Sequence, residues 1–417
     1  MLGAMSVAPA HAAGQASPSV APPPGSPRFG LFDSLRAIAA ICVLMTHVAY
    51  TSGANYNSAF GSLLAQLTVG VPIFFIISGF LLYRPFFAAR VEGREHRSLR
   101  SFARSRLLRI VPAYWLALTV LAIGPGLKGV FTEDWWIYYG FAQGYSADTV
   151  VKGLPQAWSL GVELAFYVCL PFLAVGLARL SRGGRDAVRT DLLALGALVL
   201  CCQAFRVYAH LDGSPFLFQT LPATFDWFAL GMALAVLSVA VAARERPPGA
   251  VRFLAARPGL SWIGAVVTFV LVATLLDLPR GLETEYTFAQ RSLQHFGFGL
   301  AAVLLCLPAV FGQEAGGLTR RLLANRGLAW LGTVSYGVFL YNLHVADWLQ
   351  GHGLTELVPP GVRYGWLMLG TLLVAAACAA VSYYGLERPL LTLKHRRRGG
   401  GGSRMGAEDA LARASIR

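Results

Sequence analysis

Long apolar stretches separated by short polar segments run through the chain. There are ten of them, most close to the roughly 20 residues that a helix needs to cross a bilayer. They cover residues 31–50, 64–87, 110–124, 157–177, 191–209, 220–243, 260–278, 292–311, 328–349 and 365–386. The pattern predicts an all-α fold: a polytopic integral-membrane bundle of about ten transmembrane helices.

Composition and charge support this prediction and orient the bundle. The chain is 55% hydrophobic and 13% charged, whereas about 25% of the residues in a soluble domain are charged. With a cytoplasmic N-terminus, 27 of the 35 Lys and Arg residues lie in inside segments, as the positive-inside rule requires. We therefore expect a multi-pass protein of the cell membrane with both termini cytoplasmic. The basic residues are dispersed among the loops, so no nucleic-acid partner is expected.

Three segments differ from the apolar core. Residues 1–28 are rich in Ala, Pro, Ser and Gly and lack the features of a signal peptide, so they predict a disordered cytoplasmic tail. Residues 392–417 predict a basic, flexible cytoplasmic tail that is attracted to anionic membrane lipid. The transmembrane domain is expected over residues 29–391. Within it, the aromatic stretch 125–156 predicts an interfacial or re-entrant helix.

Two ionisable residues share one face of the first predicted span. Arg36 and His47 are eleven positions apart, which is about three helical turns and about 16 Å along the axis. Ionisable residues inside hydrocarbon are costly and usually functional. Arg36 either reaches lipid phosphate or contacts an anion on a polar track. His47 either bonds to a neighbouring helix or takes a proton from a hydroxyl as a general base. Asp33 is expected to cap the helix and pair with Arg36.

Other polar residues are candidates by position. Arg106 and Arg109 face the same side of a helix and can grip a diphosphate, although arginines of this kind are often only topology signals. Glu163 lies about six residues into its span, at the depth estimated for His47, so we expect the two to approach within direct or one-water hydrogen-bond reach. Asp226 lies at a comparable depth and is a weaker candidate. His295 and His344 are interpreted first as packing histidines, and Ser78 with Gly79 as a site of close helix packing.

Taken together, these segments resemble acyltransferase family 3. The matching motifs are Arg36-x10-His47, FF-x-x-SGFLL-x-R from Phe74 to Arg84, R-x-x-R with PAYW from Arg106 to Trp115, WSL-x-VE-x-x-FY from Trp158 to Tyr167, LG-x-x-SYG-x-x-LY from Leu331, and ERP at Glu387–Pro389. Two positions depart from the family pattern: the second acid of the fourth span is replaced by Leu164, and the Trp-His of the ninth span reads Tyr341-Asn342.

The resemblance implies an enzyme that moves a short acyl group, most simply acetyl, from acyl-CoA to a hydroxyl. It implies that His47 is the catalytic base, that Glu163 assists it, and that acyl-CoA is a donor substrate without any tightly bound cofactor. It also implies that substrate or acyl-CoA is bound by a set of residues from several spans: Arg36, Arg106, Arg109, Ser78, Arg84, Trp158, Tyr167 and Asp226. Expected partners are a hydroxyl-bearing acceptor, membrane lipid and, in some states, a second copy of the chain.

Two matters stay open at the level of sequence. The acceptor is a glycan, a lipid-linked sugar or a small natural product such as a macrolide, and no motif separates these. The alternative function is a transporter or flippase for a polar or lipid-linked solute, in which Arg36, His47 and Glu163 relay charge.

Overall fold

The computed structural model describes residues 31–95, 98–181, 184–242, 249–281, 285–311 and 317–391. Within these ranges the chain is helical and contains no strand. The predicted tails 1–28 and 392–417 lie outside the described residues.

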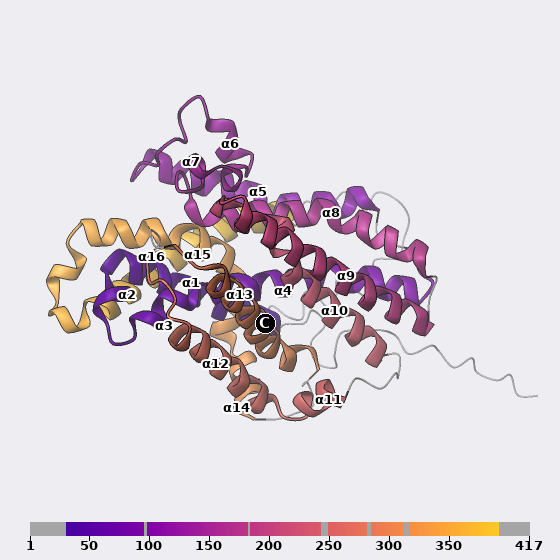
Figure 1. Ribbon diagram of the computed structural model, residues 1–417. Coiled ribbons are helices and arrows are strands. Elements are labelled where there is room, and N and C mark those ends of the chain that lie inside the picture. The colour runs from indigo at the N-terminus through magenta and orange to yellow at the C-terminus, as the bar shows by residue number, and fades with distance from the viewer. Residues whose placement is uncertain are drawn as a thin grey trace, which may run out of the picture.

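The described residues include ten long helices, which form the bundle (Figure 1). They are α1 (Leu31–Ser52), α4 (Gly70–Val91), α5 (Leu99–Ile123), α8 (Trp158–Leu180), α9 (Gly184–Leu211), α10 (Leu221–Ala242), α12 (Pro258–Leu275), α13 (Phe288–Val310), α15 (Arg326–Gly351) and α16 (Arg363–Ser382). The shorter α-helices are α2 (Ala54–Asn57), α3 (Gly61–Gln66), α6 (Trp135–Tyr139), α7 (Ala147–Val150), α11 (Gly249–Ala255) and α14 (Leu318–Leu323). A π-helical turn, Tyr383–Glu387, follows α16.

Nine segments of the described chain are long and apolar enough to cross a membrane, and they correspond to nine of the ten predicted spans. The remaining prediction, 328–349, falls on α15, which is not among those nine. This helix runs parallel to α1. Near one end Gly332 lies against the backbone of Asp33, and near the other Thr51 donates a hydrogen bond to Asp347 at 2.6 Å. Because α15 packs along the length of α1 and buries Ser335 and Asn342, it can carry polar residues that a wholly lipid-facing span could not.

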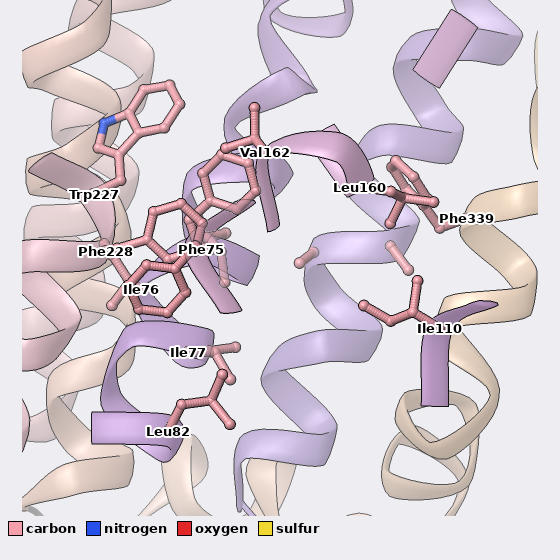
Figure 2. Packing of buried hydrophobic residues seen from close by; sticks show 14 of the residues in the cluster. Phe75, Ile76, Ile77, Leu82, Ile110, Leu160, Val162, Trp227, Phe228 and Phe339 are labelled. Atoms are coloured by element: carbon pink, nitrogen blue, oxygen red, sulfur yellow. The ribbon is translucent and has the colours of Figure 1, made fainter. Parts of the chain in front are cut away.

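Close helix packing at Ser78–Gly79 is confirmed. A methyl group on Gly79 would lie 2.2 Å from the carbonyl oxygen of Phe228, and one on Gly231 would lie 2.1 Å from that of Ile76. Glycine at both positions therefore lets α4 and α10 approach backbone to backbone. Next to this contact the rings of Phe75 and Phe228 stack with centroids 4.4 Å apart (Figure 2).

The third long helix begins earlier than its apolar span. The apolar span starts at residue 110, but α5 starts at Leu99, where the side chain of Ser98 accepts a hydrogen bond from the backbone of Ser101. Arg106 and Arg109 therefore lie within the helix and not in a loop before it. Hydropathy finds only the apolar part of such a helix, because its first turns are basic.

The sequence predicts an interfacial or re-entrant helix in the stretch 125–156, and the structure has several short helices there. Helices α6 and α7 stand at one end of the bundle (Figure 1). Tyr138 is fully buried, whereas Trp135 and Trp136 are more than half exposed. The buried ring anchors the segment, and the exposed indoles suit a membrane interface.

Candidate active site

A cavity of about 190 Å³ lies where α1, α4, α8, α9, α10, α13 and α15 meet. Of the residues assigned from the sequence, His47 and Trp158 line it. The polar lining also includes Gln156, Arg206, Arg291 and His295. A concave, largely aromatic site with a few convergent polar groups is the usual form of a substrate site.

The hydrogen bonds of Asn342 determine the tautomer of His47. The Asn342 amide nitrogen donates to the carbonyl oxygens of Val338 and Phe339, at 3.0 Å each. Its oxygen must then be an acceptor, and this oxygen contacts Nδ1 of His47. Neutral His47 consequently carries its proton on Nδ1, and Nε2 keeps a lone pair. An imidazole in this state, at the wall of a cavity, can accept a proton from a bound hydroxyl.

A second histidine of the cavity is held by a carboxylate. Nε2 of His295 lies 2.6 Å from Oδ2 of Asp226, and both residues are 5% exposed. Gln203 donates to the same oxygen at 2.9 Å, and the Trp227 ring stacks on the imidazole at 4.1 Å. Asp226 thus lies behind the cavity wall and orients His295, a role that its spacing in the sequence did not indicate.

The predicted direct hydrogen bond between Glu163 and His47 is not formed. Glu163 Oε1 accepts hydrogen bonds from Ser78 at 2.6 Å and from Tyr167 at 2.5 Å. Two lining residues lie earlier on the same helices. On α4, Pro72 precedes Ser78 by six residues, and on α8, Trp158 precedes Glu163 by five residues. At 1.5 Å per residue, Ser78 and Glu163 therefore lie about 9 Å and about 8 Å further along their helices than the two lining residues. Counting from the helix end gave the wrong depth, because α8 and α1 are offset in the bundle.

The carboxylate of Glu163 belongs instead to a cluster around Arg36. Glu163, Tyr167 and Arg109 all lie within electrostatic range of Arg36. The predicted pairing of Arg36 with Asp33 is confirmed at 2.9 Å. Arg106 likewise lies within electrostatic range of Tyr167.

Arg109 is a partly buried arginine of this cluster. It makes no salt bridge in the described part of the chain, although buried Glu387 of the π-helical turn lies within electrostatic range. The cluster therefore brings together Arg36, Arg106 and Arg109, which can bind phosphate oxygens.

Two further candidates do not line the cavity. Arg84 is 8% exposed and donates to Ser238 at 3.0 Å, so it joins α4 to α10. His344 is not among the lining residues either, but it lies within electrostatic range of His47.

Several residues of the site were not found from the sequence. Asn342 was noted only as a departure from a motif, and Arg206 and Arg291 were not singled out. Gln156 was passed over because a single amide has no sequence signal. An ionisable residue at the end of an apolar stretch was the one available signal for the two arginines.

Comparison with known proteins decides the family. A model of the acyltransferase domain of acyltransferase family 3 matches residues 30–380. The chain belongs to acyltransferase family 3. No solved structure matches the chain.

Relatives in acyltransferase family 3 differ in length. The chain is 27% identical to YrhL of Bacillus subtilis, named as a candidate peptidoglycan O-acetyltransferase, over 86% of this chain and 54% of that protein. It is 29% identical to the exopolysaccharide production protein ExoZ of Rhizobium meliloti, over 79% of this chain and 91% of that protein. It is 22% identical to the peptidoglycan O-acetyltransferase OatA of Listeria monocytogenes, over 86% of this chain and 55% of that protein. The chain thus spans about half the length of YrhL and OatA.

Proposed function

We propose that this protein transfers an acetyl or other short acyl group from acyl-CoA to a hydroxyl group of a glycan or related acceptor. The observation that carries the proposal is His47 at the cavity wall, with Nδ1 bonded to Asn342 and Nε2 left as a proton acceptor. Membership of an acyltransferase family and relatives named for O-acetylation support the reaction type.

The proposed chemistry is a direct transfer. Nε2 of His47 takes the proton of the acceptor hydroxyl while its oxygen attacks the thioester carbonyl. When the tetrahedral intermediate collapses, the carbon–sulfur bond breaks, and the thiolate of coenzyme A takes the proton from the imidazolium. The products are the ester and free coenzyme A, and His47 returns to its starting state. No covalent acyl-enzyme is required.

The arginine cluster fits the donor end of this reaction. Arg36 and His47 lie on one face of α1, about 16 Å apart along its axis. Phosphates of coenzyme A bound by Arg36, Arg106 and Arg109 would allow its extended pantetheine arm to present the thioester near His47. The basic residues of the chain favour a cytoplasmic position for this cluster and for both termini.

The acceptor is proposed to be a glycan hydroxyl. OatA is named for peptidoglycan and ExoZ for exopolysaccharide production, and both of these polymers carry sugar hydroxyls. Lipid-linked sugars and macrolides carry equivalent hydroxyls.

The experiment uses purified protein in lipid nanodiscs with labelled acetyl-CoA. A transferase releases coenzyme A in amounts equal to the label recovered in the acceptor, and only when an acceptor is present. Mass spectrometry of envelope glycans from cells with and without the protein should show an added acyl mass. Solute movement across vesicles without acyl-CoA consumption would contradict the proposal and favour a transporter.

The donor site has its own test. Arg106→Ala combined with Arg109→Ala should raise the KM for acetyl-CoA roughly 10-fold and flatten its dependence on salt, because charge-assisted phosphate contacts are lost. Arg104→Ala is the matched control, since Arg104 is exposed on the same helix. An unchanged KM in the double variant would leave these arginines as topology signals only.

A further inference from the structure

A buried arginine of the cavity has no anionic group in direct contact among the described residues. Arg206 is 2% exposed and donates only to backbone carbonyl oxygens, those of Ala223 at 3.3 Å and Arg291 at 3.2 Å. Its Nε is buried without a hydrogen-bond partner. It forms no salt bridge within the described ranges. A buried charge is normally paired, because its loss of hydration is otherwise uncompensated.

A second arginine shares the same wall. The guanidinium carbons of Arg206 and Arg291 lie 5.2 Å and 4.5 Å from the ring centroid of Phe218. Both arginines line the cavity. Two like charges held against one ring repel each other, and an anion in the cavity would attract both. Asp226 lies within electrostatic range of Arg206 but forms no salt bridge with it, and its two oxygens are engaged by His295, Gln203 and the backbone of Trp227.

Two glutamines of the cavity wall have an acceptor oxygen without a donor among the described residues. Gln156 donates through Nε2 to the carbonyl oxygen of Leu340 at 2.9 Å, so its Oε1 is an acceptor, and this atom is buried. Oε1 of Gln219, another lining residue, is buried in the same way. Neighbouring atoms cover both oxygens, so a ligand hydroxyl reaches them only after the side chains turn toward the cavity.

We infer that the cavity binds an anionic sugar, a polyol that carries a carboxylate or a phosphate, as the acyl acceptor. Its anionic group lies against Arg206 and Arg291, and one of its hydroxyls meets Nε2 of His47. This inference rests on the proposed transferase function and adds the chemical class of the acceptor. The indoles of Trp158 and Trp227 supply apolar faces, and about 190 Å³ suits one sugar ring better than an oligosaccharide.

The test measures sugar binding without acyl-CoA. Protein in phosphatidylcholine nanodiscs, whose headgroups carry no net charge, is titrated with radiolabelled glucuronate, glucose 1-phosphate and glucose. The anionic sugars should bind roughly 10-fold or more tightly than glucose, since each charge-assisted hydrogen bond contributes that order of affinity. The two anionic arms identify which of carboxylate and phosphate is preferred.

Variants assign the preference to the two arginines. Arg206→Gln and Arg291→Gln should each abolish it, whereas Arg206→Lys should retain part of it. Arg257→Gln is the matched control, because Arg257 also stacks on an aromatic ring, that of Phe253 at 4.3 Å, away from the cavity. If Arg206→Gln does not fold, as judged by gel filtration, partly buried Arg291 carries the test alone.

The outcomes separate this inference from the proposed function. Equal affinity for glucose and the anionic sugars, absence of binding, or a preference that survives Arg291→Gln would overturn the inference. Acyl transfer to neutral acceptors would then leave the transferase function standing. Conversely, an arginine-dependent preference for anionic sugars without transfer from any acyl-CoA would support the anion site and end the transferase proposal.

Discussion

Two helix pairs each hold a histidine of the same cavity, and they hold it differently. On α1 and α15, His47 is bonded to the neutral amide of Asn342. On α10 and α13, His295 is bonded to the carboxylate of Asp226 and covered by the ring of Trp227. A neutral amide selects the tautomer of an imidazole and stabilises its charged form only weakly, whereas a carboxylate attracts the proton strongly. The first arrangement suits a base that gains and loses a proton in each turnover. The second suits a fixed pair that shapes the cavity wall.

The largest expected effect is that of His47→Ala. Loss of a general base typically lowers the rate about 10²–10⁴-fold, so acetyl transfer should nearly vanish while acetyl-CoA binding and the melting temperature stay close to wild type. His295→Ala should lower the rate per folded molecule far less. Coenzyme A release should be measured in parallel for both variants. Normal turnover by His47→Ala, or an equal loss of rate in the two variants, would contradict the distinction between the two histidines.

Asn342→Leu should have the next largest effect. The apolar side chain leaves Nδ1 of His47 without its acceptor, so the tautomer is no longer selected and the rate should fall roughly 10–100-fold. Asn342→Asp should restore much of the rate, because a carboxylate also accepts from Nδ1. The charge of the new carboxylate stabilises the protonated imidazole. As the pH falls, Asn342→Asp should therefore lose activity at a higher pH than the wild type does. A pH–rate profile for Asn342→Asp identical to wild type would argue against this contact.

Asp226→Asn should act on stability more than on chemistry. Removing the charge that faces His295 in a buried site costs about 1–3 kcal/mol, which a thermal unfolding curve in nanodiscs would detect. Transfer per folded molecule should change little. If the rate instead falls as far as in His47→Ala, with the melting temperature unchanged, His295 takes part in proton transfer and the two histidines are not distinct in role.

Glu163→Gln should have the smallest effect. The carboxylate lies near Arg36 and Arg109, so its neutralisation should lower the KM for acetyl-CoA a few-fold at low salt and leave the pH profile unchanged. The amide oxygen can still accept from Ser78 and Tyr167. Glu133→Gln, in the exposed part of the segment between α5 and α8, is the control. A rate loss of 100-fold or more with an altered pH profile would restore Glu163 as the partner of His47.

The contrast between the two histidines could be predicted from the sequence only in part. His47 was found because Arg36 lies on the same helical face, a relation that depends on one helix alone. The interpretation of His295 as a packing residue missed its place in the cavity wall, because that place depends on α13 meeting α9 and α10. Its pairing with Asp226 spans 69 positions, and no local pattern reports such a distance.

The sequence by itself determined the helices and the family. Apolar stretches long enough to cross a bilayer can satisfy their backbone only as helices, and the motifs from Arg36 to Pro389 sufficed to indicate acyltransferase family 3. Only the tertiary structure decided which polar groups meet. It brought Asn342 to His47, gathered Arg206, Arg291 and Gln156 around one cavity, and moved Glu163 away from it. The physical reason is that hydropathy defines each helix along its own axis, whereas the offset and rotation between helices come from close contacts such as Gly79 against Phe228.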